Sequence, residues 1–193
     1  MARAQHAFSS FGGEKYVAIG TSQGLFLYYE GAFFDITPLD TAITGATFDT
    51  NNNSTSVTVN KTTHNLAVGR YITFTSVTPP PGSGYVASDF TAGAFEIVQV
   101  NDANSFNIVM RTNASADTTA VGSATINPYV EVGPTFQTTG YGWGTYLWGD
   151  STWGTARTVS NVILDPGNWS LDNFGEVLVA TIFNGKTFTW DAG

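Results

Sequence analysis

The chain has 193 residues, of which 42% are hydrophobic and only 11% are charged. Fifteen acidic residues against seven basic ones give a formal net charge of −8, which argues against a nucleic-acid backbone as the main partner. Cysteine is absent, which excludes disulfides, thiolate catalysis and cysteine-ligated zinc. No apolar run approaches about 18 residues and no signal-peptide pattern is visible, so we expect a soluble protein made in a cytoplasm, without a membrane segment.

An up-and-down meander of three strands is predicted near the N-terminus. Each predicted strand is a run of apolar and aromatic residues, and the glycines between them lie where short hairpin turns need a positive φ. Pro38 ends the third strand, because proline cannot donate a ladder hydrogen bond. The predicted strands are 16–21, 25–29 and 32–37.

From Asp40 onward the chain is rich in threonine and asparagine. Runs of alternating apolar and polar residues follow, separated by turn signals, and this period of two indicates half-buried antiparallel strands. We therefore predict a small antiparallel β-sandwich or barrel domain over about residues 40–133. The predicted strands are 56–60, 70–77, 94–100, 105–111 and 123–132.

The most unusual stretch is 140–155, GYGWGTYLWGDSTWGT, in which three tryptophans recur every five residues and each precedes a glycine. A helix disfavours glycine, and in a strand a five-residue step places successive rings on opposite faces. We expect an irregular ribbon whose rings pack between sheets or between subunits, with sugar stacking as the alternative. The residues assigned to packing or to an interface are Tyr141, Trp143, Tyr146, Trp148, Trp153, Trp169 and Trp190.

The two ends of the chain resemble each other. Residues 16–29, YVAIGTSQGLFLYY, align without a gap with 177–190, VLVATIFNGKTFTW, and an acidic residue follows in both. Repeated short hairpins of this kind suggest β-propeller blades. We therefore predict an all-β protein in which propeller-like blade hairpins, over 1–39 and 134–193, are interrupted by the inserted domain at 40–133. Few blades are visible, so we expect a longer protein or oligomerisation to complete the sheets.

Histidine chemistry is not indicated by this sequence. His6 and His64 are the only histidines, and they form neither a metal-spaced set nor part of a nucleophile triad. We interpret His64 as a turn residue that hydrogen-bonds its own backbone. The sequence predicts no catalytic residue, no metal site and no cofactor.

Carboxylate pairs offer an alternative interpretation, because a glycosidase needs two nearby acids. Two groups of acids are close in sequence, but we expect Asp172 to cap a turn instead of acting in catalysis. The stretch 49–53 supplies oxygen ligands for calcium but lacks the glycine and glutamate of an EF-hand loop, so a solvated turn is the preferred interpretation. The acids considered are Asp35 and Asp40, and Asp165, Asp172 and Glu176.

Four stretches, in this order, resemble the nozzle or tail-hub protein of short-tailed bacteriophages, also called a tail stabilisation protein. They are YVAIGT…GLFLYYEGAFFDITPL, a VTV…H-x-L-x-VG-x-Y-ITF pattern over 57–74, GYGWG…WG…TWGT, and WSLDNFGE-x-L-VA…WD. The resemblance covers nearly the whole chain. It implies a propeller with inserted β domains that assembles as a ring, commonly a hexamer, around the DNA exit channel below the portal.

These observations lead to the interpretation that the chain is a non-catalytic structural component of a phage tail, located in the virion after assembly in the host cytoplasm. Its expected partners are further copies of itself and other tail or portal proteins, with DNA passing through a channel without specific binding. The alternatives are a carbohydrate-binding module of a tail fibre or secreted glycanase, and a glycoside hydrolase. Trp148→Ala is expected to cost roughly 3–5 kcal/mol if Trp148 is a core residue and little if it is an exposed sugar platform.

Overall fold

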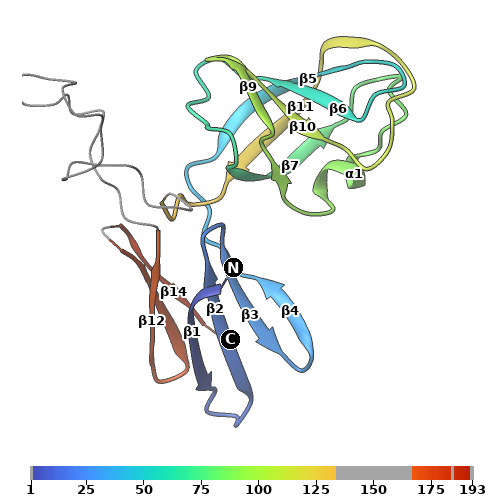
Figure 1. Cartoon of the computed structure of the whole chain (residues 1–193). Helices are drawn as coiled ribbons and strands as arrows, with labels where there is room; N and C mark the ends of the chain where they lie inside the picture. The colour runs from blue at the N-terminus through green and yellow to red at the C-terminus, as the bar shows by residue number, and fades with distance from the viewer. Residues whose placement is uncertain (1, 134–166, 184, 192–193) are drawn as a thin grey trace, which may run out of the picture. The chain divides into compact units, whose positions relative to one another are not determined.

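A computed structural model describes residues 2–133, 167–183 and 185–191 (Figure 1). The chain divides into two compact units, one formed by 1–37 with 131–193 and the other by 38–130. All strand pairs are antiparallel and the described chain has one short helix, which confirms the predicted all-β class. No helix among the described residues is long and apolar enough to span a membrane. The propeller-like arrangement of the chain ends stays a prediction.

The first unit begins with a four-stranded meander in the order β1-β2-β3-β4. Its strands are β1 (Ala2–Ser9), β2 (Lys15–Thr21), β3 (Leu25–Tyr29) and β4 (Ala32–Asp35). The three predicted strands are present, and β4 ends two residues early, where Asp35 accepts a hydrogen bond from the Thr37 N–H at 3.0 Å. β1 is not predicted, because its residues are mostly small and polar and only Phe8 is buried.

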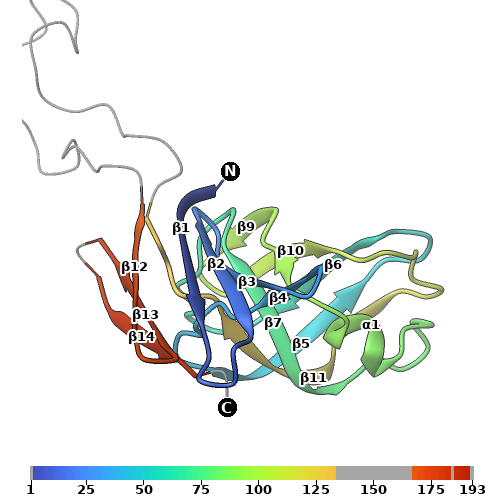
Figure 2. The ribbon, with the colours of Figure 1, turned by 90° about the horizontal axis from the view of Figure 1, so that it is seen from below.

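A second sheet of the first unit contains β12 (Trp169–Phe174), β13 (Val177–Ile182) and β14 (Thr187–Trp190), in that order. β12 contacts β1 and β2, so the two sheets lie side by side (Figures 1 and 2). The Trp169 indole N–H donates to the Thr21 carbonyl oxygen at 2.9 Å. A Cβ at Gly20 would lie 2.6 Å from ring atoms of Trp169, so only glycine lets this side chain lie so close to β2.

The two hairpins of the sequence repeat are both present, but they bury opposite faces of the aligned strands. The gapless alignment pairs even-numbered positions of β2 with odd-numbered positions of β13, yet both strands bury their even-numbered residues. The turns differ accordingly. The Thr21 N–H donates to Gly24 at 2.8 Å, whereas the Ile182 N–H donates to Lys186, one residue farther along, at 3.1 Å. A one-residue shift of this kind exchanges the two faces of a strand.

The second unit is built on a seven-stranded sheet in the order β8-β7-β11-β5-β6-β10-β9. The sheet curls on itself (Figure 1). It encloses an apolar core that includes Phe48, Phe74, Phe90 and Phe106. Phe90 belongs to the helix α1 (Ala87–Thr91), which no sequence pattern predicts. The strands are β5 (Ile43–Thr50), β6 (Ser56–Asn60), β7 (Tyr71–Thr78), β8 (Phe95–Glu96), β9 (Gln99–Asp102), β10 (Ser105–Val109) and β11 (Thr118–Pro128).

One short segment joins the two ends of this sheet. The range 94–100 is predicted as a single strand, but the structure divides it between β8 and β9, which pair with β7 and β10 at opposite ends of the strand order. Ile97 is fully buried, and its N–H donates to the Arg70 carbonyl oxygen at 3.0 Å. The next N–H, of Val98, donates to Asn107 of β10, also at 3.0 Å. The segment changes partner at the core residue, which brings the sheet ends together.

Candidate functional site

Of the seven aromatic residues assigned to packing or an interface, only Trp169 and Trp190 lie in the described part of the chain. Trp169 is 3% exposed and packs on β2, and Trp190 is half-buried. Their part in a contact between subunits stays a prediction. The residues that lie outside the described part are Tyr141, Trp143, Tyr146, Trp148 and Trp153, together with the candidate acid Asp165.

Trp190 belongs to an aromatic cluster between the two sheets of the first unit. Its ring centroid lies 5.8 Å from that of Tyr16 and 6.3 Å from that of Phe8, in both cases edge-on. The Tyr16 ring lies 4.8 Å from that of Tyr29. Aromatic pairs in such geometries add about 0.5–1.5 kcal/mol each beyond their burial. The cluster therefore holds the sheets together and is mainly a core.

A carboxylate borders this cluster. Glu14 accepts hydrogen bonds from the Tyr16 hydroxyl at 2.7 Å and from the Tyr29 hydroxyl at 3.2 Å. The bond from Tyr16, followed by that from Tyr29, lowers the pKa of Glu14. The same bond, with a smaller contribution from burial, raises the pKa of Tyr16 to about 12. Glu14 is therefore ionised at neutral pH and fixes the two tyrosines.

The other face of the β1–β4 sheet carries an apolar patch over β2, β3 and β4, bordered by Gln5, Lys15 and Asp35, and this patch stays accessible in the described part of the chain. Val17 pairs with Tyr28, Ile19 with Phe26, and Tyr28 with Phe33, which places these side chains together on one face. Tyr28 is 39% and Phe33 66% exposed, with their ring centroids 5.1 Å apart. Contiguous exposed apolar surface on a protein marks an interaction site. We name this set (Val17, Ile19, Phe26, Tyr28 and Phe33) the outer apolar face.

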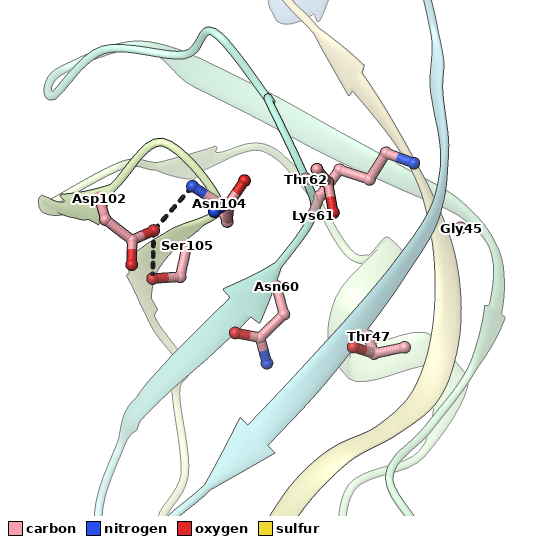
Figure 3. A pocket seen from close by; sticks show the side chains of 8 residues that line it. All are labelled: Gly45, Thr47, Asn60, Lys61, Thr62, Asp102, Asn104 and Ser105. Carbon is pink, nitrogen blue, oxygen red and sulfur yellow. Dashed lines mark hydrogen bonds between the residues drawn. The ribbon is translucent and has the colours of Figure 1, made fainter.

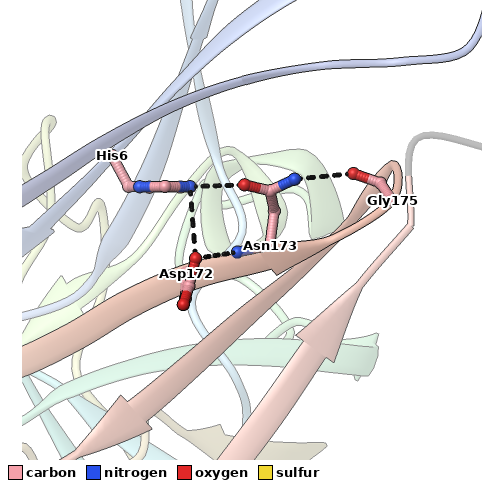
Figure 4. Close-up of polar contacts among 4 residues, drawn as sticks. All are labelled: His6, Asp172, Asn173 and Gly175. Atoms are coloured by element: carbon pink, nitrogen blue, oxygen red, sulfur yellow. Dashed lines mark hydrogen bonds and ion pairs between the residues drawn. The ribbon is translucent and has the colours of Figure 1, made fainter.

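His6 links β1 to β12 (Figure 4). Its Nε2 atom lies 2.7 Å from Asn173 Oδ1 and 4.0 Å from Asp172 Oδ1. The prediction for Asp172 is confirmed in part: its Oδ1 accepts a hydrogen bond from the Asn173 N–H at 2.8 Å, but the residue lies within β12, where it pairs with Val179, and not in a turn. The Asp172 side chain is 86% exposed, and an exposed pair at this distance contributes little stability. The arrangement joins the β1–β4 and β12–β14 sheets.

The remaining candidate acids make structural hydrogen bonds or ion pairs. In the first unit, Glu176 accepts from the Phe11 N–H at 3.1 Å, and Asp35 accepts from the Thr37 hydroxyl at 2.6 Å. In the second unit, Asp40 forms an ion pair of 2.7 Å with Arg70. Among the described residues no group of three metal-ligating side chains is present.

His64 has the local role that the sequence indicates. It is 3% exposed, and its Nδ1 accepts from the Leu66 N–H at 3.0 Å. Its Nε2 lies 3.1 Å from the Asp102 carbonyl oxygen, and its ring packs edge-on against Phe106. The interpretation of His64 as a turn residue bonded to the backbone is confirmed.

The second unit carries a polar groove of about 310 Å³ on the outside of its sheet (Figure 3). Asp102, Asn104 and Ser105, from the turn between β9 and β10, form one side, and Thr47 of β5 lies on the other (Figure 3). Lys61 follows directly after β6, between them. No charge pattern or motif in the sequence singles out these residues. Those in strands occupy the polar positions of an alternation between apolar and polar residues. That alternation indicates a side facing solvent and does not by itself indicate a binding site.

No protein-family model matches the chain. A search of curated proteins also finds no match. Among solved structures, the chain is similar to one named Phage phi92 endosialidase, with a TM-score of 0.35 and 15% sequence identity. The match covers 66% of this chain and 19% of that one, so this chain spans about a fifth of the solved structure's length.

The comparison corrects one expectation. We expect from the sequence that the chain is not an enzyme, and this expectation is withdrawn because the similar solved structure is named an endosialidase. At this level of similarity and coverage, the match assigns no activity to this chain. The similar structure is a phage protein by name, whereas the nozzle or tail-hub resemblance rests on the sequence stretches alone.

Proposed function

We propose that the chain is a structural component of a bacteriophage tail, of the nozzle or tail-hub kind, that acts through protein–protein contacts in the virion. Two features support the proposal. The ordered sequence stretches resemble that family, and the first unit supplies a four-stranded antiparallel meander, which is the unit of a propeller blade. The net charge of −8 suits a wall past which DNA moves without being held.

The observation that carries the proposal is that the β1–β4 sheet has an accessible apolar patch on the face turned away from β12–β14. An antiparallel sheet with one solvated face normally alternates apolar and polar residues. Here the inner face packs against β12–β14, while the outer apolar face presents aliphatic and aromatic side chains of β2, β3 and β4. A sheet of this kind needs a layer on each side.

We propose that the second layer is the β12–β14 sheet of another copy of this chain. The outward side of that sheet carries β-branched side chains of β13 and β14, which suit packing against another sheet, with Ser170, Asp172 and Phe174 of β12 beside them and no lysine or arginine. A contact between two different surfaces is head-to-tail, and it closes into a ring where the rotation permits. The β-branched residues of β13 and β14 concerned are Val177, Val179, Thr181, Thr187 and Thr189.

The test is the mass in solution, measured by light scattering over a range of concentrations. The wild-type chain is expected to reach a multiple of its 20.6 kDa mass. Phe33→Ser is expected to return it to a monomer, since Phe33 is the most exposed residue of the outer apolar face. The matched control is Phe11→Ser, because Phe11 is 84% exposed but lies in the β1–β2 turn, off this face. A wild-type monomer at every concentration would contradict the proposal, as would unchanged assembly of Phe33→Ser.

A further inference from the structure

Two rows of polar side chains cross the outside of the second unit's sheet. The register of β5, β6, β10 and β9 places one residue of each strand directly opposite its neighbour in each row. None of these positions is apolar, although the inward positions of the same strands are almost all apolar. The first row is Thr47, Asn60, Ser105 and Asp102, and the second is Asp49, Thr58, Asn107 and Gln99.

The second row satisfies its own hydrogen bonds. The Thr58 hydroxyl donates to Asn107 Oδ1 at 2.9 Å, and Asn107 Nδ2 donates to Gln99 Oε1 at 3.3 Å. Asn60 Nδ2 donates to Asp49 Oδ1 at 2.7 Å, which ties the first row to the second. These bonds fix the positions of the amides before any ligand arrives, and a preorganised surface loses less entropy on binding.

The first row borders the polar groove, where hydrogen-bonding capacity is left over. Within the described residues the side chains of Thr47, Lys61 and Thr62 make no hydrogen bond or ion pair. On the opposite side, Asp102 Oδ1 accepts from the Asn104 N–H at 2.7 Å and from the Ser105 hydroxyl at 3.1 Å. The bond from Asn104 is the larger cause of the lowered pKa of Asp102, so this carboxylate is ionised and its second oxygen remains an acceptor.

We propose that this groove binds a neutral saccharide through its hydroxyl groups. Sugar hydroxyls need donors and acceptors together, and the groove supplies ammonium, hydroxyl, amide and carboxylate groups within about 310 Å³. The charges of Lys61 and Asp102 offset each other and Asp49 stands one row away, which disfavours an anion. The lining has no aromatic or aliphatic platform, which disfavours an apolar ligand.

The experiment is a titration of the isotope-labelled chain, followed by the shifts of its amide NMR signals. The probes are maltotriose and tri-N-acetylchitotriose as neutral saccharides and inorganic phosphate as an anion. Without an aromatic platform, we expect dissociation constants on the order of 1 mM for a saccharide. The expected result is saturable shifts at the groove residues with at least one trisaccharide, and none there with phosphate.

Paired variants separate the groove from the rest of the surface. Thr47→Val with Lys61→Met removes two of the unused polar groups, and we expect about tenfold weaker binding, which is about 1.4 kcal/mol. The matched control is Thr119→Val with Lys186→Met, the same exchanges at exposed positions outside the groove and outside the two surfaces proposed to meet on self-assembly. Absence of saturable shifts with both trisaccharides, equal losses in the two double variants, or tighter binding of phosphate would overturn the proposal. None of these results depends on self-assembly by the first unit.

Discussion

The two units differ in where the apolar residues of their sheets lie. The second unit curls one sheet around its apolar residues and turns polar rows outward, so its core is complete in the described residues. The first unit has a sheet with one apolar face that β12–β14 covers and an apolar patch on the opposite face that β12–β14 leaves accessible. Burial of apolar side chains in the second unit therefore stabilises that unit itself. The accessible apolar side chains of the first unit are available for association with another surface.

The largest effect is expected in the core of the second unit. Phe48 is fully buried, with its ring 4.7 Å from that of Phe90 and 5.7 Å from that of Phe74. Phe48→Ala is therefore expected to lower the free energy of unfolding by about 3–5 kcal/mol, as measured by denaturant unfolding. Val109→Ala, at a 51% exposed position of β10, is the control and should change it by less than about 0.5 kcal/mol. Equal effects of the two would contradict a closed core.

A smaller effect is expected where the two sheets of the first unit meet. Gly20→Ala places a methyl group 2.6 Å from Trp169 ring atoms and should destabilise that unit by about 1–3 kcal/mol. Tryptophan fluorescence during unfolding gives the measurement. Gly93→Ala is the control, since a Cβ there has no neighbour within 4 Å. If Gly20→Ala unfolds like wild type, the contact between β2 and β12 is not as close as described.

The smallest effect is a pH dependence confined to the first unit. The pKa of Glu14 is lowered by its tyrosine partners, so its stabilising contribution is present above the ordinary value of 4.5 and is lost as pH falls through the folded-state pKa. The pKa of Tyr16 is raised to about 12, so its contribution is present below the ordinary value of 10.0 and is lost as pH rises toward 12.

Glu14→Gln should remove part of the acid dependence of unfolding, and Tyr16→Phe should remove the phenol whose pKa is raised to about 12, as followed by phenolate absorbance. The control is Glu131→Gln, an exposed acid of the same unit that is not one of the described groups that raise the pKa of Tyr16 or Tyr29. If Glu14→Gln leaves both the acid dependence and the tyrosine titration unchanged, the hydrogen bonds between Glu14 and its two tyrosines do not contribute as described.

Local sequence patterns predict the hairpins well, because alternation and glycine-containing turns act within a few residues. They miss β1, β5, β12 and α1, whose conformations depend on partners elsewhere in the chain, as the pairing of β5 with β11 and the contact of Trp169 with Gly20 illustrate. The two aligned segments of the sequence repeat have similar residues but bury opposite faces of their strands. The second hairpin has one more residue in its turn, and this residue sets the register of the strands. The polar groove cannot be predicted from the sequence either. Its residues come from separate strands, and only the register between those strands brings them together.

The central claim is that the outer apolar face is covered by another copy of the chain, and a single introduced thiol tests it directly. The protein contains no cysteine, so Phe33→Cys and Phe11→Cys each carry one reactive group. The rate of labelling by a maleimide is measured as protein concentration rises. We predict that the thiol at position 33 becomes protected while the thiol at position 11 keeps its rate. Labelling at position 33 that is independent of concentration, in a chain that stays monomeric, would contradict the claim.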